Sequence, residues 1–163
     1  MVLVRRIARP MLASMFISGG INSFKNSNYL QTRAAPVTHR LSPLVEKATA
    51  SLPVQLDAQQ MVQLNGAVHV VAGAMLATGR LPRTSALALA VTLVPTTLAG
   101  HRFWEETDPQ QRANQQVHFF KNVSMVGGLL LASVDTEGKP SLAWLARRQA
   151  KRAAKRASEL TPG

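Results

Sequence analysis

Apolar and charged residues are segregated along this 163-residue chain instead of being interleaved. Four blocks contain no aspartate, glutamate, lysine or arginine, and the charges lie between them. Surface helices of a soluble bundle carry a charged stripe every three or four residues, and these blocks have none. The pattern therefore predicts an all-α fold, a four-transmembrane-helix bundle. The expected spans are residues 7–24, 61–80, 84–103 and 117–134.

Only the second span has enough charge-free residues unaided, because a membrane crossing needs about 20, and the other three need help at their ends. The first is long enough if it starts at Ile7 and Arg9 extends its side chain back to the headgroups. The last includes Lys121, which must snorkel or find a partner. The N-terminus also resembles a signal peptide, but no clean cleavage site follows its apolar stretch, so we interpret it as a retained anchor.

Lysine and arginine are shared unevenly between the two sides of the predicted bundle. With the N-terminus inside, twelve of the 19 fall on the cytoplasmic side and seven outside. The positive-inside rule then predicts cytoplasmic termini in a multi-pass protein of the plasma membrane. Residues 1–138 would form the membrane domain and residues 139–163 a basic tail. This tail is expected to be an amphipathic helix that attracts anionic lipids and not nucleic acid, since it lacks interleaved aromatic residues.

Prolines mark two further features. In the outer loop between Lys25 and Gln60, a short amphipathic helix is expected to start at Ser42 as N-cap and Pro43 as first helical residue. In the third span, Pro95 removes one backbone donor and predicts a kink, where the two threonines that follow could bind the freed groups.

Two long segments are distinctive: LVPTTLAGHRFWEETDP at Leu93–Pro109 and QVHFFKNVSMVGGLLLASVDTEGKPSL at Gln116–Leu142. Both resemble actinobacterial members of the DoxX family. The stretches Arg5–Gly20 and Gln63–Arg83 agree with the resemblance. It implies a four-span membrane fold and a link to redox and sulfur metabolism, including thiosulfate-to-quinone electron transfer in the related DoxD branch. The resemblance identifies a family and not a reaction.

Polar side chains gather in the outer half of the predicted bundle. An ionisable group inside a membrane costs roughly 3 kcal/mol or more, so each should have a partner or a purpose. We expect these residues to converge on one cavity that opens to the outside. Its candidate catalytic residues are His101, Glu105 and His69. Its candidate cofactor-binding residues are Asn65, Arg102, His118, Lys121 and Asn122.

Such a cavity suits two ligands. A quinone headgroup needs hydrogen-bond donors at its carbonyls, which His69, His101 or Lys121 could supply while Glu105 exchanges the proton. A metal ion could use the histidines and Glu105, but these come from three helices without ligand spacing, so no metal site is predicted.

The structural alternative is an inert network that ties the helices together. Arg102 could face Glu105 or Glu106, and we favour this interpretation for Arg102 with Glu106. A single His69 bonded to Thr96 or Thr97 would be of the same kind. Small residues are expected to form packing seams or, as the alternative, a homodimer face. They are Gly19, Gly20, Gly66, Gly73, Ala77, Gly127 and Gly128.

The absence of cysteine excludes disulfides, thiolate metal sites and a Cys-x-x-Cys redox couple within this chain. With no flavin or haem-ligand pattern either, the chain suits a membrane subunit or scaffold that has no catalytic activity alone. The resemblance implies that its partners are redox or oxidative-stress proteins. The alternative is a membrane subunit of a quinone-linked oxidoreductase of the thiosulfate-quinone type, with quinone as its cofactor.

Overall fold

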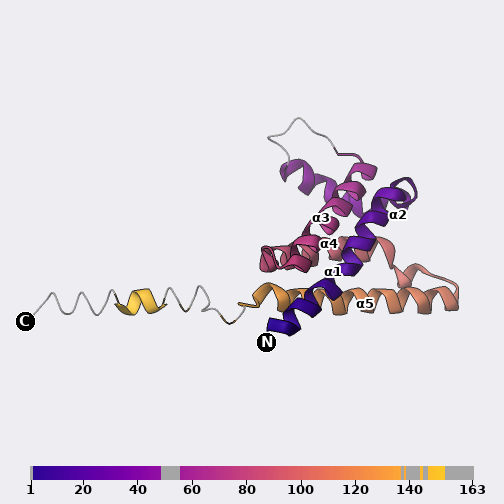
Figure 1. Cartoon of the computed structure of the whole chain (residues 1–163). Helices are drawn as coiled ribbons and strands as arrows, with labels where there is room; N and C mark the ends of the chain where they lie inside the picture. Colours follow the sequence, from indigo (N-terminus) through magenta and orange to yellow (C-terminus); the bar gives the residue numbers. More distant parts are fainter. Residues whose placement is uncertain (1, 49–55, 137, 139–143, 145–146, 153–163) are drawn as a thin grey trace, which may run out of the picture.

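The computed structural model describes residues 2–48, 56–136, 138, 144 and 147–152 (Figure 1). All regular elements in this part of the chain are helical, so the all-α prediction is confirmed. The elements are α1 (Val2–Lys25), α2 (Ser27–Ala48), α3 (Ala58–Thr78), α4 (Pro82–Gly100), the 3-10 helix η1 (Phe103–Glu105) and α5 (Pro109–Val134).

Three stretches are long and apolar enough to cross a membrane: Ala58–Thr78, Pro82–Glu105 and Pro109–Val134. The helix α1 is a fourth candidate, because it has 24 residues and its charges before Lys25 are confined to its first turns. Twenty helical residues rise about 30 Å, which matches the hydrocarbon thickness. Exposed apolar side chains on α1 and α5, such as Met11 and Leu131, fit a lipid-facing surface.

Capping residues explain why two helices begin before the predicted spans. Asp57 accepts a hydrogen bond from the backbone N–H of Gln60, whose side chain accepts one from the backbone N–H of Asp57. This capping box starts α3. In the same way, the Asp108 carboxylate accepts from the N–H of Gln111, and Pro109 is the first residue of α5.

The segment after α1 is one long helix, so the prediction that a short helix starts at Ser42 is wrong. The helix α2 runs through both Pro36 and Pro43. These prolines are seven residues apart on one face and both are exposed, so the carbonyls left without an amide donor face outward. Ser42 Oγ donates to the carbonyl of Thr38 instead of capping the helix.

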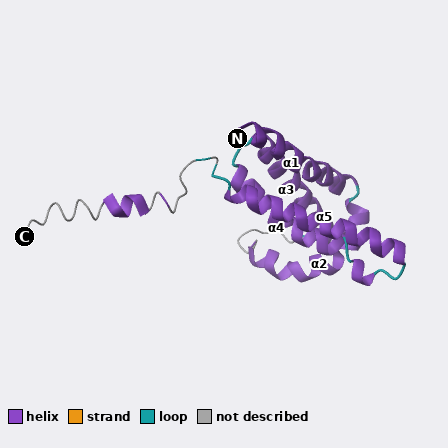
Figure 2. Cartoon of the chain, turned by 90° about the horizontal axis from the view of Figure 1, so that it is seen from below, coloured by secondary structure: helices purple, strands orange, loops and turns teal. Residues whose placement is uncertain are grey.

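Side-chain contacts define two ends of the bundle. At one end, Arg5 of α1 donates to both carboxylate oxygens of Asp135, which follows α5, at 2.6 and 2.8 Å. Arg83 at the start of α4 donates to the carbonyl of Ser133 at 2.9 Å. At the other end, Ser27 of α2 accepts hydrogen bonds from the first two turns of α3. The N-terminus therefore lies beside the end of α5 (Figures 1 and 2).

The buried apolar core lies toward the end of the bundle that holds the Arg5–Asp135 pair. It combines side chains of α1, α3, α4 and α5, with leucines and alanines in most positions. Its members are Ala13, Phe16, Ala72, Leu76, Ala86, Leu89, Ala90, Leu93 and Leu129. The polar residues considered below lie nearer the other end.

The helices α1 and α3 make the most extensive contact in the bundle, because small residues bring their backbones together. A Cβ atom added at Gly20 would lie 2.6 Å from the carbonyl oxygen of Gly66. A Cβ atom added at Gly66 or Gly73 would likewise lie within 3 Å of an atom of α1. The predicted packing seam is therefore confirmed at these three positions. Gly19 and Gly127, by contrast, have nothing within 4 Å of an added Cβ and lie outside the seam.

Two neighbouring glycines of α1 test this seam. Gly20→Ala should lower the free energy of unfolding in detergent by about 1–3 kcal/mol, because the new methyl group meets a backbone oxygen that cannot rotate away. Gly19→Ala is the matched control and should be neutral or slightly stabilising, since both substitutions gain the same helix propensity. Thermal or denaturant unfolding measures both variants, and equal stability of the two would contradict the seam.

Candidate functional site

Three threonine hydroxyls of α4, at Thr92, Thr96 and Thr97, form what we call the threonine row. Each hydroxyl donates its proton to a backbone carbonyl one turn earlier, at 2.7–2.8 Å. Because a hydroxyl has one proton and two acceptor lone pairs, each oxygen remains available as an acceptor. The threonine row thus offers three hydrogen-bond acceptors inside a bundle of apolar helices.

Helix α3 supplies two donors to this row. Asn65 Nδ2 donates to Thr96 Oγ1 at 3.0 Å, and His69 Nε2 lies 3.1 Å from Thr92 Oγ1. The proton of Thr92 is directed to the carbonyl of Ala88, so the imidazole is the donor and Nε2 carries its hydrogen. The donors are four residues apart on α3 and the acceptors four apart on α4, which is the register of two antiparallel helices.

His69 therefore differs from its predicted partner by one helical turn. The expected hydrogen bond of His69 was to Thr96 or Thr97. Thr96 instead accepts from Asn65, and His69 bonds Thr92. The imidazole is only 4% exposed and stands edge-on to Phe16 of α1, with 5.4 Å between ring centroids. His69 thus joins three helices in the middle of the bundle.

Helix α5 supplies the third donor. Asn122 Nδ2 donates to Thr97 Oγ1 at 3.0 Å, and both residues are buried. One interhelical hydrogen bond thus ties α5 to α4. Together, the donors on α3 and α5 make α4 the hydrogen-bonding centre of the bundle.

Pro95 lies within the threonine row without ending α4. Proline leaves the carbonyl of Val91 without its usual donor, and the two threonines that follow were expected to bind the freed groups. Their hydroxyls instead bond the carbonyls of Thr92 and Leu93. The hydroxyls of Thr96 and Thr97 therefore accept hydrogen bonds from the neighbouring helices and do not bond the carbonyl of Val91.

A second group of polar residues, here called the histidine cluster, consists of His101, Gln115, His118 and Lys121. His101 Nδ1 lies 2.8 Å from Gln115 Oε1, and the rings of His101 and His118 stack with centroids 5.2 Å apart. Lys121 Nζ lies 3.2 Å from His118 Nδ1. The cluster forms where α4 ends and α5 begins.

The remaining two candidates form an exposed pair. Arg102 Nη1 lies 2.9 Å from Glu105 Oε2, so the predicted pairing of Arg102 with Glu106 is wrong. His101 and Glu105 are four residues apart in sequence, but α4 ends at Gly100 and Glu105 belongs to η1. They therefore do not share one face of a continuous helix.

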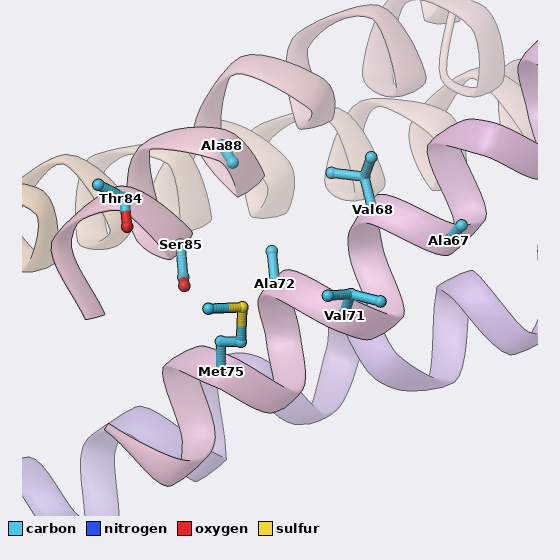
Figure 3. A pocket seen from close by; sticks show the side chains of 8 residues that line it. All are labelled: Ala67, Val68, Val71, Ala72, Met75, Thr84, Ser85 and Ala88. Atoms are coloured by element: carbon cyan, nitrogen blue, oxygen red, sulfur yellow. The ribbon is translucent and has the colours of Figure 1, made fainter. Parts of the chain in front are cut away.

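By their contacts, the eight predicted site residues thus separate into three groups. A groove of about 420 Å³ lies elsewhere, between α3 and the first turns of α4 (Figure 3). None of the eight residues lines this apolar groove. It is lined by Ala67, Val68, Val71, Ala72, Met75, Thr84, Ser85 and Ala88.

Sequence reasoning missed two members of these groups. Thr92 precedes Thr96 by one turn on the same face of α4, so helical spacing could have indicated it. Gln115 lies in a segment expected to precede the fourth span, and only the early start of α5 at Pro109 places it beside His101. The stacking of His101 on His118 required the distance between two helices, for which the sequence carries no signal.

The interior polar groups are chemically satisfied. In the described part of the chain, no buried side-chain nitrogen or oxygen lacks a hydrogen-bond partner. Within the same residues, no group of three or more histidine, aspartate or glutamate side chains is placed to hold a metal ion. Satisfied polar groups of this kind are typical of helix–helix contacts in membranes.

Long apolar helices that pack through small residues and satisfy their interior polar groups define a multi-span α-helical membrane protein. A family model described as DoxX matches residues 4–102, and the chain belongs to the DoxX family. This match covers more than half of the chain but stops before α5, so the resemblance noted at Gln116–Leu142 lies beyond it. The match does not show a lineage. No curated protein matches the chain, and no solved structure does.

A threonine pair tests the bond between His69 and the threonine row. Thr92→Val should destabilise the protein by about 1–2 kcal/mol, because it keeps the shape of the side chain and leaves a buried imidazole N–H without an acceptor. Thr78→Val is the matched control. Its hydroxyl also bonds a carbonyl one turn earlier but is exposed, so the change should be near neutral. If both variants unfold alike, His69 does not depend on Thr92.

Proposed function

We propose that this chain is a membrane subunit or scaffold without catalytic activity of its own. It spans the plasma membrane four times, has both termini in the cytoplasm, and holds redox or oxidative-stress proteins at the membrane. The observation that carries the proposal is the threonine row, where buried polar side chains are committed to contacts between helices. Side chains committed in this way are poorly suited to bind a substrate or transfer its proton.

The arrangement of the helix ends supports the proposed topology. The Arg5–Asp135 pair holds the start of α1 beside the end of α5, as an even number of spans requires. Twelve of the 19 lysines and arginines belong to this end or to the chain beyond it, which favours the cytoplasm. The basic residues at 147–152 are exposed and helical, and Arg148 lies 5.0 Å from the ring centroid of Trp144, as suits a segment at a headgroup surface.

The redox assignment rests on the family. The chain has no cysteine, so thiol chemistry must come from a partner protein. Residues 139–143, 145–146 and 153–163 of the predicted tail lie outside the described residues. Exposed basic residues near the membrane suit either anionic lipid or an acidic partner.

The histidine cluster favours a second candidate function, the membrane subunit of a quinone-linked oxidoreductase. His101 and His118 are stacked and partly exposed near the end of α4, so their nitrogens can be reached by a ligand, unlike that of His69. An imidazole and an ammonium group are suitable donors for quinone carbonyls. In this candidate function the catalytic role falls to His101 and not to His69.

Purification from native membranes in mild detergent separates the two functions. The scaffold proposal predicts redox proteins in stoichiometric amounts and no quinone, both in the wild type and in His101→Ala. Quinone that is retained by the wild type and by the exposed-histidine control His39→Ala, but lost in His101→Ala, would establish the second function. Mass spectrometry of the proteins and extraction of quinone from the same sample give both answers. The absence of any stoichiometric partner would contradict the scaffold.

A further inference from the structure

We propose that the apolar groove between α3 and α4 binds a membrane lipid. One acyl chain of the lipid lies along the groove, and its ester carbonyl accepts a hydrogen bond from the hydroxyl of Ser85. The proposal needs only a chain that spans a membrane, and it does not rest on the scaffold function. It concerns a part of the bundle that neither of the two functions above uses.

Ser85 presents a buried hydroxyl to the groove. The residue is only 4% exposed, and Figure 3 shows its side chain pointing from α4 toward Ala72 and Met75 of α3. Within the described residues, this hydroxyl has no hydrogen-bond partner. Every fully enclosed side-chain nitrogen or oxygen in the same part of the chain does have one. The Ser85 oxygen therefore opens onto the groove, where a ligand can bond it.

The backbone of α4 explains why the hydroxyl of Ser85 is left over. A serine or threonine inside a helix commonly donates to the carbonyl one turn earlier, as the threonine row does. For Ser85 this carbonyl belongs to Leu81, and it already accepts the backbone N–H of Ser85 and the hydroxyl of Thr84, both at 3.0 Å. A carbonyl oxygen has two lone pairs, so both are in use. The hydroxyl of Ser85 needs an acceptor from outside its own helix.

The groove has the size and the walls that an acyl chain needs. Its volume of about 420 Å³ lies within the range of small-molecule sites, about 300–1,000 Å³. Between Ala67 and Met75 it follows α3 for roughly 12 Å. Val71 at its edge is 59% exposed, so the groove opens to the outside of the bundle. Because both helices are long and apolar enough to cross a membrane, that outside is the hydrocarbon of the bilayer.

The groove also has a polar end and an apolar end, as a lipid has. Thr84 and Ser85 belong to the first turn of α4, and the exposed Arg80 lies in the turn between α3 and α4. The other end is lined by Ala67 and Val68. The first turn of a spanning helix lies near the edge of the hydrocarbon, where the ester carbonyls of lipids are found. A headgroup near Arg80 thus places its ester at Ser85 and its chain toward Val68.

A single ester carbonyl suits this groove better than a quinone headgroup. A quinone has two carbonyls on opposite sides of its ring, and a carbonyl that loses water without gaining a donor costs free energy. Among the residues that line the groove, only Thr84 and Ser85 carry hydroxyls. Thr84 donates its proton to the carbonyl of Leu81. One donor remains, and one acceptor satisfies it.

Lipids with and without ester carbonyls test the contact with Ser85. The full chain is delipidated in mild detergent and titrated with dioleoyl phosphatidylglycerol or its dialkyl ether analogue, and native mass spectrometry gives an apparent Kd for each. The wild type should bind the diester about threefold to tenfold more tightly, as expected for one neutral hydrogen bond. Ser85→Ala should lose this preference. Ser124→Ala, which removes an exposed hydroxyl bonded to its own helix, should keep it.

A second pair of variants tests the position of the acyl chain. Ala88→Leu fills the groove and should weaken the binding of both lipids about tenfold, because the chain loses its apolar contacts. Ala113→Leu adds the same side chain at an exposed position of α5 and should change neither Kd. Ser85→Ala removes one oxygen without adding volume, so it keeps the test valid if Ala88→Leu does not fold.

Three results would overturn the proposal. The first is equal affinity of the wild type for the diester and the ether lipid. The second is a quinone with a short tail, decylubiquinone, that displaces the diester from the wild type but not from Ser85→Ala, which would assign the hydroxyl to a quinone. The third is a wild type that is dimeric and an Ala88→Leu variant that is monomeric, which would assign the groove to a second copy of the chain.

Discussion

A polar side chain inside a bilayer has no water to bind, so its partner must come from the protein, either from the backbone of its own helix or from another helix. In this protein the threonine row of α4 provides those partners. Each hydroxyl gives its proton to the backbone of its own helix and accepts from Asn65, His69 or Asn122. Since each hydroxyl oxygen is fixed by its own helix, the donors on α3 and α5 must align with it. The relative position of three helices depends on this constraint.

The rest of the bundle is arranged around that centre. Toward one end the core is apolar and closes with the Arg5–Asp135 pair, which brings the first and last helices together. Toward the other end, basic and aromatic groups accumulate where α4 passes into η1 and α5. The close contact of α1 with α3 at Gly20 and Gly66 adds van der Waals packing, the principal attraction between helices in lipid. The charged side chains therefore lie at the two ends of the bundle, on either side of the threonine row.

The sequence allowed the four apolar helices α1, α3, α4 and α5 to be predicted, because blocks without charges can be recognised from composition alone. It did not allow α2 to be predicted, since Pro36 and Pro43 suggest interruptions and their exposure depends on the surrounding helices. Likewise, the hydrogen-bond partners of the candidate residues were not predicted. His69 bonds Thr92 and Arg102 bonds Glu105, because helix rotation and the change to a 3-10 turn decide such pairings.

A double-mutant cycle between Asn122 and Thr97 tests most directly the claim that the interior polar residues hold the helices together. The variants are Asn122→Leu, Thr97→Val and the double substitution, compared by their free energies of unfolding in one detergent. The account predicts a coupling energy of about 1 kcal/mol, as for other interhelical hydrogen bonds in membranes. A coupling energy indistinguishable from zero, with additive single effects, would contradict it.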